Sequence, residues 1–260
     1  MSLPVVPDRQ LGQHFLIDEN ILGVAGRLAG LAPDDVVLEV GAGLGVLTAY
    51  LADRVGVVHA VELDRRLEPH LRERLAGHGN VQLVFGDALV LPLGELDPPA
   101  TKLVANLPYQ IATPLVAESL GGLPGVRLWC VMVQREVADR FFAQPGTKSY
   151  GAVSVLVQLT AERVGFHPVA RTCFRPPPNV DSALVAFRRR RDWGAELDSV
   201  RETVQAAFGH RRKTLANSFE LAGVPRERVL AALLELDAPR DARAESLAPT
   251  EFLRLAELLG

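Results

Sequence analysis

The sequence is poor in cysteine, in aromatic residues and in long apolar runs. Its two cysteines, Cys130 and Cys173, lack the spacing of a metal site or a disulfide framework, so we expect reduced thiols, no metal and a cytoplasmic location. The longest uncharged apolar stretches fall well short of the roughly 20 residues that cross a bilayer. The amino terminus holds prolines and charges where a signal peptide would be apolar, so we expect neither secretion nor membrane insertion. The composition, 48% hydrophobic and 23% charged in 260 residues, is typical of a globular protein with one large domain or a domain and an appendage.

Charge is distributed unevenly along the chain, although the net charge is only −3. Between Arg188 and Arg228, ten Lys and Arg residues accompany six Asp and Glu residues, so this segment carries +4 and the remainder −7. A basic region attached to an acidic body is typical of a polyanion binder, and a solvated helical face is the alternative interpretation. We take Arg211, Arg212 and Lys213 as candidate contacts to nucleic-acid phosphates.

Strands and helices alternate through the first half of the chain. The apolar run Val36–Val40 indicates a strand, which leads into a glycine-rich loop over 41–45 and a helix over Val46–Arg54. The next strand, Val57–Val61, ends before Glu62, about 20 residues after the first glycine, the spacing at which an acid meets a ribose hydroxyl in Rossmann-like folds. This order predicts an α/β fold with a Rossmann-like sheet.

The glycine-rich loop fits S-adenosylmethionine better than NAD. Its third glycine is Gly45, one position earlier than in a dinucleotide fingerprint. Glu39 would also place a carboxylate beside a pyrophosphate, an unfavourable contact, whereas an amino group and a sulfonium are attracted to it. We therefore take Glu39, Gly41, Gly43 and Glu62 as candidate cofactor residues, with a nucleotide-dependent oxidoreductase as the alternative.

Asp87 follows a third predicted strand, Val81–Phe85. At the carboxyl end of that strand its carboxylate can accept a hydrogen bond from the adenine amino group of the cofactor. The alternative interpretation is a helix or turn cap.

The tetrapeptide Asn106-Leu107-Pro108-Tyr109 follows a fourth strand, Lys102–Ala105, and would project into the ligand site at the edge of the sheet. Asn106 offers an amide oxygen, Pro108 stiffens the backbone so that the Leu107 carbonyl can face a substrate, and Tyr109 offers a ring for stacking. Together these groups suit an exocyclic amine on a planar heterocycle. The alternative is a strand-to-helix turn in which Asn caps and Tyr packs.

The second half of the chain is predicted to end in helices. Strands over Val164–Val169 and Ser182–Phe187 are expected to pair antiparallel, joined by a stiff proline loop that presents Phe174. Residues 152–160 fit a strand or a helix equally well. After a linker of arginines at 188–191, helices are expected over Val200–Phe208, Arg211–Phe219, Arg226–Leu236 and Pro249–Leu259. We therefore place one domain at 1–190 and a small all-helical domain at 191–260.

Seven motifs, in order over nearly the whole chain, resemble the small-subunit ribosomal RNA adenine N6 dimethyltransferases. They are Gln13-His14-Phe15-Leu16, Glu39-x-Gly41-x-Gly43-x-Gly45, Glu62-x-Asp64, Gly86-Asp87, the tetrapeptide, Phe174-x-Pro-Pro-Pro-x-Val-Asp-Ser, and Arg211-Arg212-Lys213-Thr214-Leu215-x-Asn217-Ser218. Methyltransferases of large-subunit RNA that confer antibiotic resistance share the first motifs but do not usually carry the last one. The family usually has Asn at the position of His14, and both side chains can donate to a carboxylate.

The resemblance implies a class I methyltransferase sheet and transfer of two methyl groups to each of two adjacent adenosines in a hairpin near the 3′ end of 16S RNA. Its cofactor residues map to His14, Leu16, Gly41, Glu62, Asp87 and Asn106. Tyr109 and Phe174 would hold the target base out of its stack, and the basic helices would grip the RNA of an immature small ribosomal subunit. We expect a monomer, and a non-catalytic assembly factor of the same lineage is the alternative.

Overall fold

The computed structural model describes residues 5–8 and 11–260, which form two compact units. The sheet unit comprises the described residues up to 138 together with 162–189, and the helical unit comprises 139–161 and 190–260. The proposed domain boundary between residues 190 and 191 falls next to the second junction. That boundary leaves residues 139–161 in the first domain, whereas their contacts group them with the carboxy-terminal helices.

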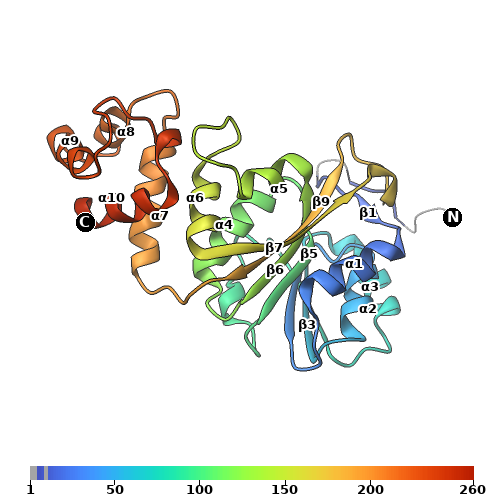
Figure 1. Ribbon diagram of the computed structural model, residues 1–260. Helices are drawn as coiled ribbons and strands as arrows, with labels where there is room; N and C mark the ends of the chain where they lie inside the picture. Colours follow the sequence, from blue (N-terminus) through green and yellow to red (C-terminus); the bar gives the residue numbers. More distant parts are fainter. Residues whose placement is uncertain (1–4, 9–10) are drawn as a thin grey trace. The chain divides into compact units, whose positions relative to one another are not determined.

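The sheet unit is built on seven strands in the order β4-β3-β2-β5-β6-β9-β7 (Figure 1). Neighbouring strands from β4 to β6 are parallel, and β9 is antiparallel to β6. The strands are β2 Val36–Val40, β3 Val57–Glu62, β4 Val81–Phe85, β5 Lys102–Asn106, β6 Leu128–Gln134, β7 Ala161–Val169 and β9 Ser182–Arg189. The strand order reverses at β2, so the carboxyl ends of β2 and β5 flank the switch point where ligands bind in open α/β sheets.

Helices cover both faces of this sheet, which is why its strands are almost continuously apolar. The helices α1 (Glu19–Ala29), α2 (Val46–Ala52) and α3 (Glu68–Arg74) share one hydrophobic core with the side chains of alternate β6 residues. On the opposite face, the indole of Trp129 in β6 donates to the hydroxyl of Ser119 in α4 (Ala112–Gly122) at 2.9 Å. The predicted α/β fold is confirmed.

A second, two-stranded sheet joins the amino-terminal segment to the proline loop. Its strands are β1 (Phe15–Leu16) and β8 (Phe174–Arg175), paired antiparallel. The expected strands at 164–169 and 182–187 are present as β7 and β9, which are neighbours in the main sheet. Residues 152–160 form the helix α6 (Ala152–Thr160) and belong to the helical unit.

The helical unit packs its helices around a small aromatic core. The ring of Phe208 contacts those of Tyr150 and Phe252, with centroid distances of 6.1 Å and 5.7 Å. Its other helices are α7 Glu196–Phe208, α8 Leu215–Leu221, α9 Arg226–Glu235 and α10 Pro249–Leu259, and α5 (Arg135–Phe141) crosses the boundary from the sheet unit. Among residues 5–8 and 11–260, no helix has the length and apolar character needed to cross a membrane.

One predicted helix begins later than expected. The prediction started it at Arg211, but α8 begins at Leu215 because the side chain of Thr214 accepts a hydrogen bond from the Asn217 N–H and caps it. Arg212 and Lys213 therefore lie with Arg211 in the loop between α7 and α8.

Candidate active site

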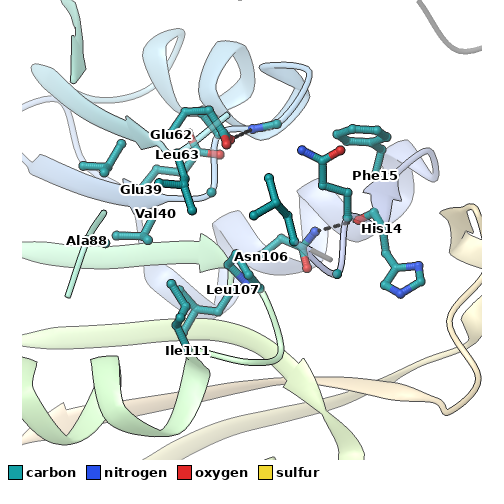
Figure 2. A pocket seen from close by; sticks show the side chains of 18 of the residues that line it. His14, Phe15, Glu39, Val40, Glu62, Leu63, Ala88, Asn106, Leu107 and Ile111 are labelled. Carbon is teal, nitrogen blue, oxygen red and sulfur yellow. Dashed lines mark hydrogen bonds between the residues drawn. The ribbon is translucent and has the colours of Figure 1, made fainter. Parts of the chain in front are cut away.

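A cavity of about 300 Å³ lies at the carboxyl ends of β2, β3 and β5 (Figure 2). Its walls come from the amino-terminal segment 11–16, the glycine loop, the end of β3, the turn after β4 and the tetrapeptide after β5. The cavity brings together most of the site residues that the sequence predicted. These are His14, Leu16, Glu39, Gly41, Gly43, Glu62, Asp87, Asn106, Leu107 and Tyr109.

Gly41 allows the glycine loop to pack closely against the tetrapeptide. Its φ is +83°, and a Cβ at this position would lie 3.0 Å from the Cδ of Pro108. Its N–H donates to the carbonyl of Val61 at 2.8 Å, which fixes the loop to the end of β3. A side chain here would therefore be strained and would push the two walls of the cavity apart.

Glu62 at the end of β3 holds the glycine loop and still faces the cavity. One carboxylate oxygen accepts from the Gly43 N–H and the other from the Asp64 N–H, both at 2.8 Å. Burial raises the pKa of Glu62, and these backbone hydrogen bonds oppose the rise. A carboxylate can accept about four hydrogen bonds, so acceptor sites remain for ligand hydroxyls.

Glu39 is the most deeply buried acid of the cavity wall, with 1% of its surface exposed. Burial raises its pKa to about 8, the nearby Thr48 hydroxyl opposes this rise, and the carboxylate of Glu62 adds to it. Its Oε2 atom has no hydrogen-bond partner. A buried carboxyl oxygen without a partner is costly, and a ligand cation or amino group would satisfy it.

Gln13, which lines the cavity, and its partner Asp64 were not predicted as site residues, although both belong to the motifs. The Gln13 side chain donates to Asp64 Oδ2 at 2.8 Å, which ties the amino-terminal segment to the end of β3. Hydrogen bonds from Arg66, with a smaller contribution from Gln13, lower the pKa of Asp64 to about 2. The sequence does show Asp64 as a second acid two residues after Glu62, but its partner Gln13 is 51 residues away in the sequence.

Asp87 closes a turn and also lines the cavity. Its Oδ1 atom accepts from the Leu89 N–H at 2.9 Å and so closes a turn. Its side chain is exposed and lines the cavity, so the carboxylate can also face a ligand there.

The tetrapeptide is fixed by long-range hydrogen bonds. The Asn106 amide donates from Nδ2 to the backbone carbonyl of His14 at 3.3 Å, which leaves Oδ1 as the acceptor (Figure 2). The Leu107 N–H donates to the carbonyl of Met132 in β6 at 3.1 Å, and the Leu107 side chain is buried. Leu107 can therefore offer its carbonyl to a ligand.

His14 and Tyr109, both lining residues, have their rings beside each other. Their ring centroids are 5.7 Å apart, and the Tyr109 hydroxyl is 2.6 Å from the Ser182 hydroxyl. The His14 ring points away from Glu39 and Glu62 (Figure 2). Its Nδ1 lies 2.8 Å from the carbonyl of Pro176, so Nδ1 is the donor. The structure thus uses the His14 ring to hold the proline loop and its backbone to hold Asn106.

Phe174 lies elsewhere than expected. Pairing of β8 with β1 directs its ring into the hydrophobic core, where 2% of its surface is exposed. It is not among the residues that line the cavity. In this conformation its ring has no face available for a base, in contrast to the expectation of a stacking residue.

The basic cluster Arg211, Arg212 and Lys213 is exposed in the helical unit. One nitrogen of Arg211, Nη2, donates to the carbonyls of Tyr150 at 2.7 Å and Lys148 at 3.2 Å. Arg211 therefore has a structural role in addition to its charge.

The charge of the cavity wall distinguishes between the two cofactor classes. Three acidic side chains, those of Glu39, Glu62 and Asp87, line it, and the described lining residues include no Lys or Arg. Such a wall attracts a ligand with positive charge and hydroxyl groups and repels a pyrophosphate. The residues present therefore fit S-adenosylmethionine and do not fit NAD.

Comparisons with known proteins identify the family of this chain. The sequence model of the ribosomal RNA adenine dimethylase family matches residues 8–260. A ribosomal RNA small subunit methyltransferase A from Rubrobacter xylanophilus is 48% identical over 249 residues, covering 96% of this chain and 94% of that protein. A protein of the same name from Thermobifida fusca is 41% identical over 264 residues, covering 98% and 91%.

Two solved structures share the fold over most of their length. A dimethyladenosine transferase from Plasmodium falciparum has a TM-score of 0.75 at 27% identity, covering 93% of this chain and 96% of that one. The 23S rRNA methyltransferase ErmE has a TM-score of 0.66 at 34% identity, covering 94% and 99%. These matches confirm the predicted class I methyltransferase fold. The chain belongs to the ribosomal RNA adenine dimethylase family, a family of methyltransferases.

Proposed function

We propose that this enzyme uses S-adenosylmethionine to dimethylate N6 of two adjacent adenosines in a hairpin near the 3′ end of small-subunit ribosomal RNA. The observation that carries the proposal is a cavity whose wall combines three acidic side chains with the tetrapeptide and, among the described lining residues, holds no Lys or Arg. The curated relatives described above are named for the small subunit, which favours this RNA over the large-subunit RNA for which ErmE is named.

The cavity wall supplies groups suited to each part of the cofactor. Glu62 would accept from the ribose hydroxyls and Asp87 from the adenine amino group, while Glu39 would face the positive charge. Backbone groups of Gly41 and Leu16, both lining residues, would pack closely against it. When bound, S-adenosylmethionine supplies an electrophilic methyl group on a sulfonium.

The tetrapeptide would position the target amine. The lone pair of an adenine amino group is delocalised into the ring, which makes it a poor nucleophile. Acceptors at Asn106 Oδ1 and the Leu107 carbonyl would bind its two N–H groups and favour a pyramidal nitrogen whose lone pair is free to react. Tyr109 would stack on the base. The amine proton becomes acidic only after methyl transfer, so orientation and electrostatics provide most of the rate enhancement and no strong base is needed.

The second methylation requires the same groups to accept the monomethyl product. That amine keeps one N–H, so one of the two acceptors is sufficient to orient it. The other must tolerate the first methyl group.

The basic cluster would bind the RNA backbone. Arg212 and Lys213 lie exposed in the loop before α8, where they can contact phosphates. We infer that the substrate is an immature small ribosomal subunit and that the enzyme acts as a cytoplasmic monomer.

Mass spectrometry of RNA tests this proposal. Small ribosomal subunits that lack the modification are incubated with the enzyme and methyl-labelled S-adenosylmethionine, and the RNA is then digested to nucleosides and fragments. We expect labelled N6,N6-dimethyladenosine at two adjacent positions in a single hairpin fragment. Label in large-subunit RNA would favour the alternative substrate, and binding of the subunit without any label would favour a non-catalytic assembly factor.

A further inference from the structure

The loop between α5 and α6 is held in place by the carboxy-terminal part of the helical unit. The Gly146 N–H donates to the carbonyl of Glu245 at 2.7 Å. Four residues later the fully buried Tyr150 donates from its hydroxyl to the carbonyl of Leu247 at 2.8 Å. Lys148 lies between these two anchors, and its side chain is exposed. The backbone around Lys148 is therefore fixed while its side chain is exposed to solvent.

Arg211 provides the third anchor. Its Nη2 atom donates to the carbonyl of Lys148 and to that of Tyr150. A guanidinium has five N–H donors in a rigid fork, and these two hydrogen bonds occupy the pair on one nitrogen. Because the guanidinium contacts the Lys148 backbone directly, the loop and the basic cluster lie side by side, although about sixty residues separate them in the sequence.

We propose that Lys148 is a further phosphate contact for RNA and that Arg211 is the positioning residue that holds it beside Arg212 and Lys213. This inference rests on the proposed RNA substrate. A fixed backbone reduces the ordering cost of binding, so a lysine on this loop is a better contact than one on a free loop. Clustered positive charges repel one another in the free protein, and a bound polyanion removes that repulsion.

The chain contains only three lysines, Lys102, Lys148 and Lys213, so amine labelling can report on each one separately. The full-length protein is treated with a water-soluble amine-acylating reagent, alone and bound to small ribosomal subunits that lack the modification. The modified peptides are then quantified by mass spectrometry. Lys102 is the internal control, because its side chain is 15% exposed and its ammonium lies 2.6 Å from Asp35 Oδ2.

We expect Lys148 and Lys213 to react in the free protein and both to be protected in the complex. Protection of Lys213 without Lys148 would overturn the inference and leave the proposed RNA surface intact. Protection of neither lysine in a complex of confirmed occupancy would overturn both proposals.

The salt dependence of subunit binding tests the positioning role of Arg211. Lys148→Ala should reduce the slope of log K against log salt by about 0.7–0.9, the value of one phosphate contact. Arg211→Lys keeps the charge but loses the hydrogen bonds to the carbonyls of Lys148 and Tyr150, and we expect a similar reduction of the salt slope. The double variant should be no weaker than Lys148→Ala, because both changes remove the same contact. A wild-type slope for Arg211→Lys, or additive losses in the double variant, would show that Arg211 does not act through Lys148.

Discussion

Cofactor binding should release a proton from Glu39. The free protein holds this carboxyl at a pKa of about 8, because it is buried and because the carboxylate of Glu62 lies nearby. At pH 7 such a group is about nine-tenths protonated. A cationic ligand beside it favours the ionised form, so the pKa falls when the cofactor binds.

The expected magnitude follows from that pKa. Binding at pH 7 should release close to one proton per cofactor, and the affinity should rise about tenfold per pH unit up to pH 8 and then level off. Titration calorimetry at pH 7 in two buffers of different ionisation enthalpy measures the proton count. A series from pH 6 to pH 9 measures the affinity. Glu39→Gln is the matched control, because it has no proton to release and should bind weakly at every pH.

The same group should affect the stability of the free protein. Its folded pKa of about 8 lies above the ordinary value of 4.5. The contribution of protonated Glu39 to the free energy of unfolding is therefore fully present below about pH 4.5 and is lost as the pH rises through 8. In Glu39→Gln the melting temperature should fall less over this pH range than in the wild type. Binding without proton release, and a wild-type melting profile for the variant, would refute the assignment of a protonated Glu39.

Three further outcomes are expected. Glu62→Ala should weaken cofactor binding by about 1–3 kcal/mol, which calorimetry measures, and unchanged affinity would remove Glu62 from the site. Gly41→Ala should lower both the melting temperature and the cofactor affinity, because the φ of +83° at Gly41 and the nearby Pro108 ring exclude a Cβ. A variant as stable as the wild type would contradict this. Replacing Arg212 and Lys213 with Ala should lower the salt slope of RNA binding by about 0.7–0.9 per lost contact, and an unchanged slope would make the cluster a solvated surface.

The sequence predicted those parts of the fold and site that depend on local patterns. Uninterrupted apolar runs indicate buried parallel strands, and polar residues directly after them mark the edge where ligands bind. Glu62, Asp87 and Asn106 were found in this way, Glu39 was found as the one acid of the strand before the glycine loop, and all four line the cavity. Their roles toward cofactor and substrate stay predictions.

The remaining features depend on contacts between distant segments. The Nδ1 of His14 donates to the carbonyl of Pro176, 162 residues away in the sequence, and the Asn106 amide donates to the carbonyl of His14, 92 residues away. Burial of Phe174 follows from the pairing of β8 with β1, a two-residue strand pair too short to show a periodic pattern. The clamp formed by Arg211 likewise joins two segments whose proximity no local pattern indicates.

The central claim is that Asn106 orients the target amine, and single-turnover methyl transfer tests it most directly. Asn106→Ala should reduce the rate by about 10²–10³-fold with little change in RNA affinity, comparable with loss of one preorganised polar contact. Asn106→Asp keeps an acceptor but cannot donate to the His14 carbonyl, so the account predicts that its rate falls as far as that of the alanine variant. An aspartate variant much faster than the alanine one would show that the His14 contact is dispensable. An alanine variant with the wild-type rate would contradict the assignment of the tetrapeptide as the active site.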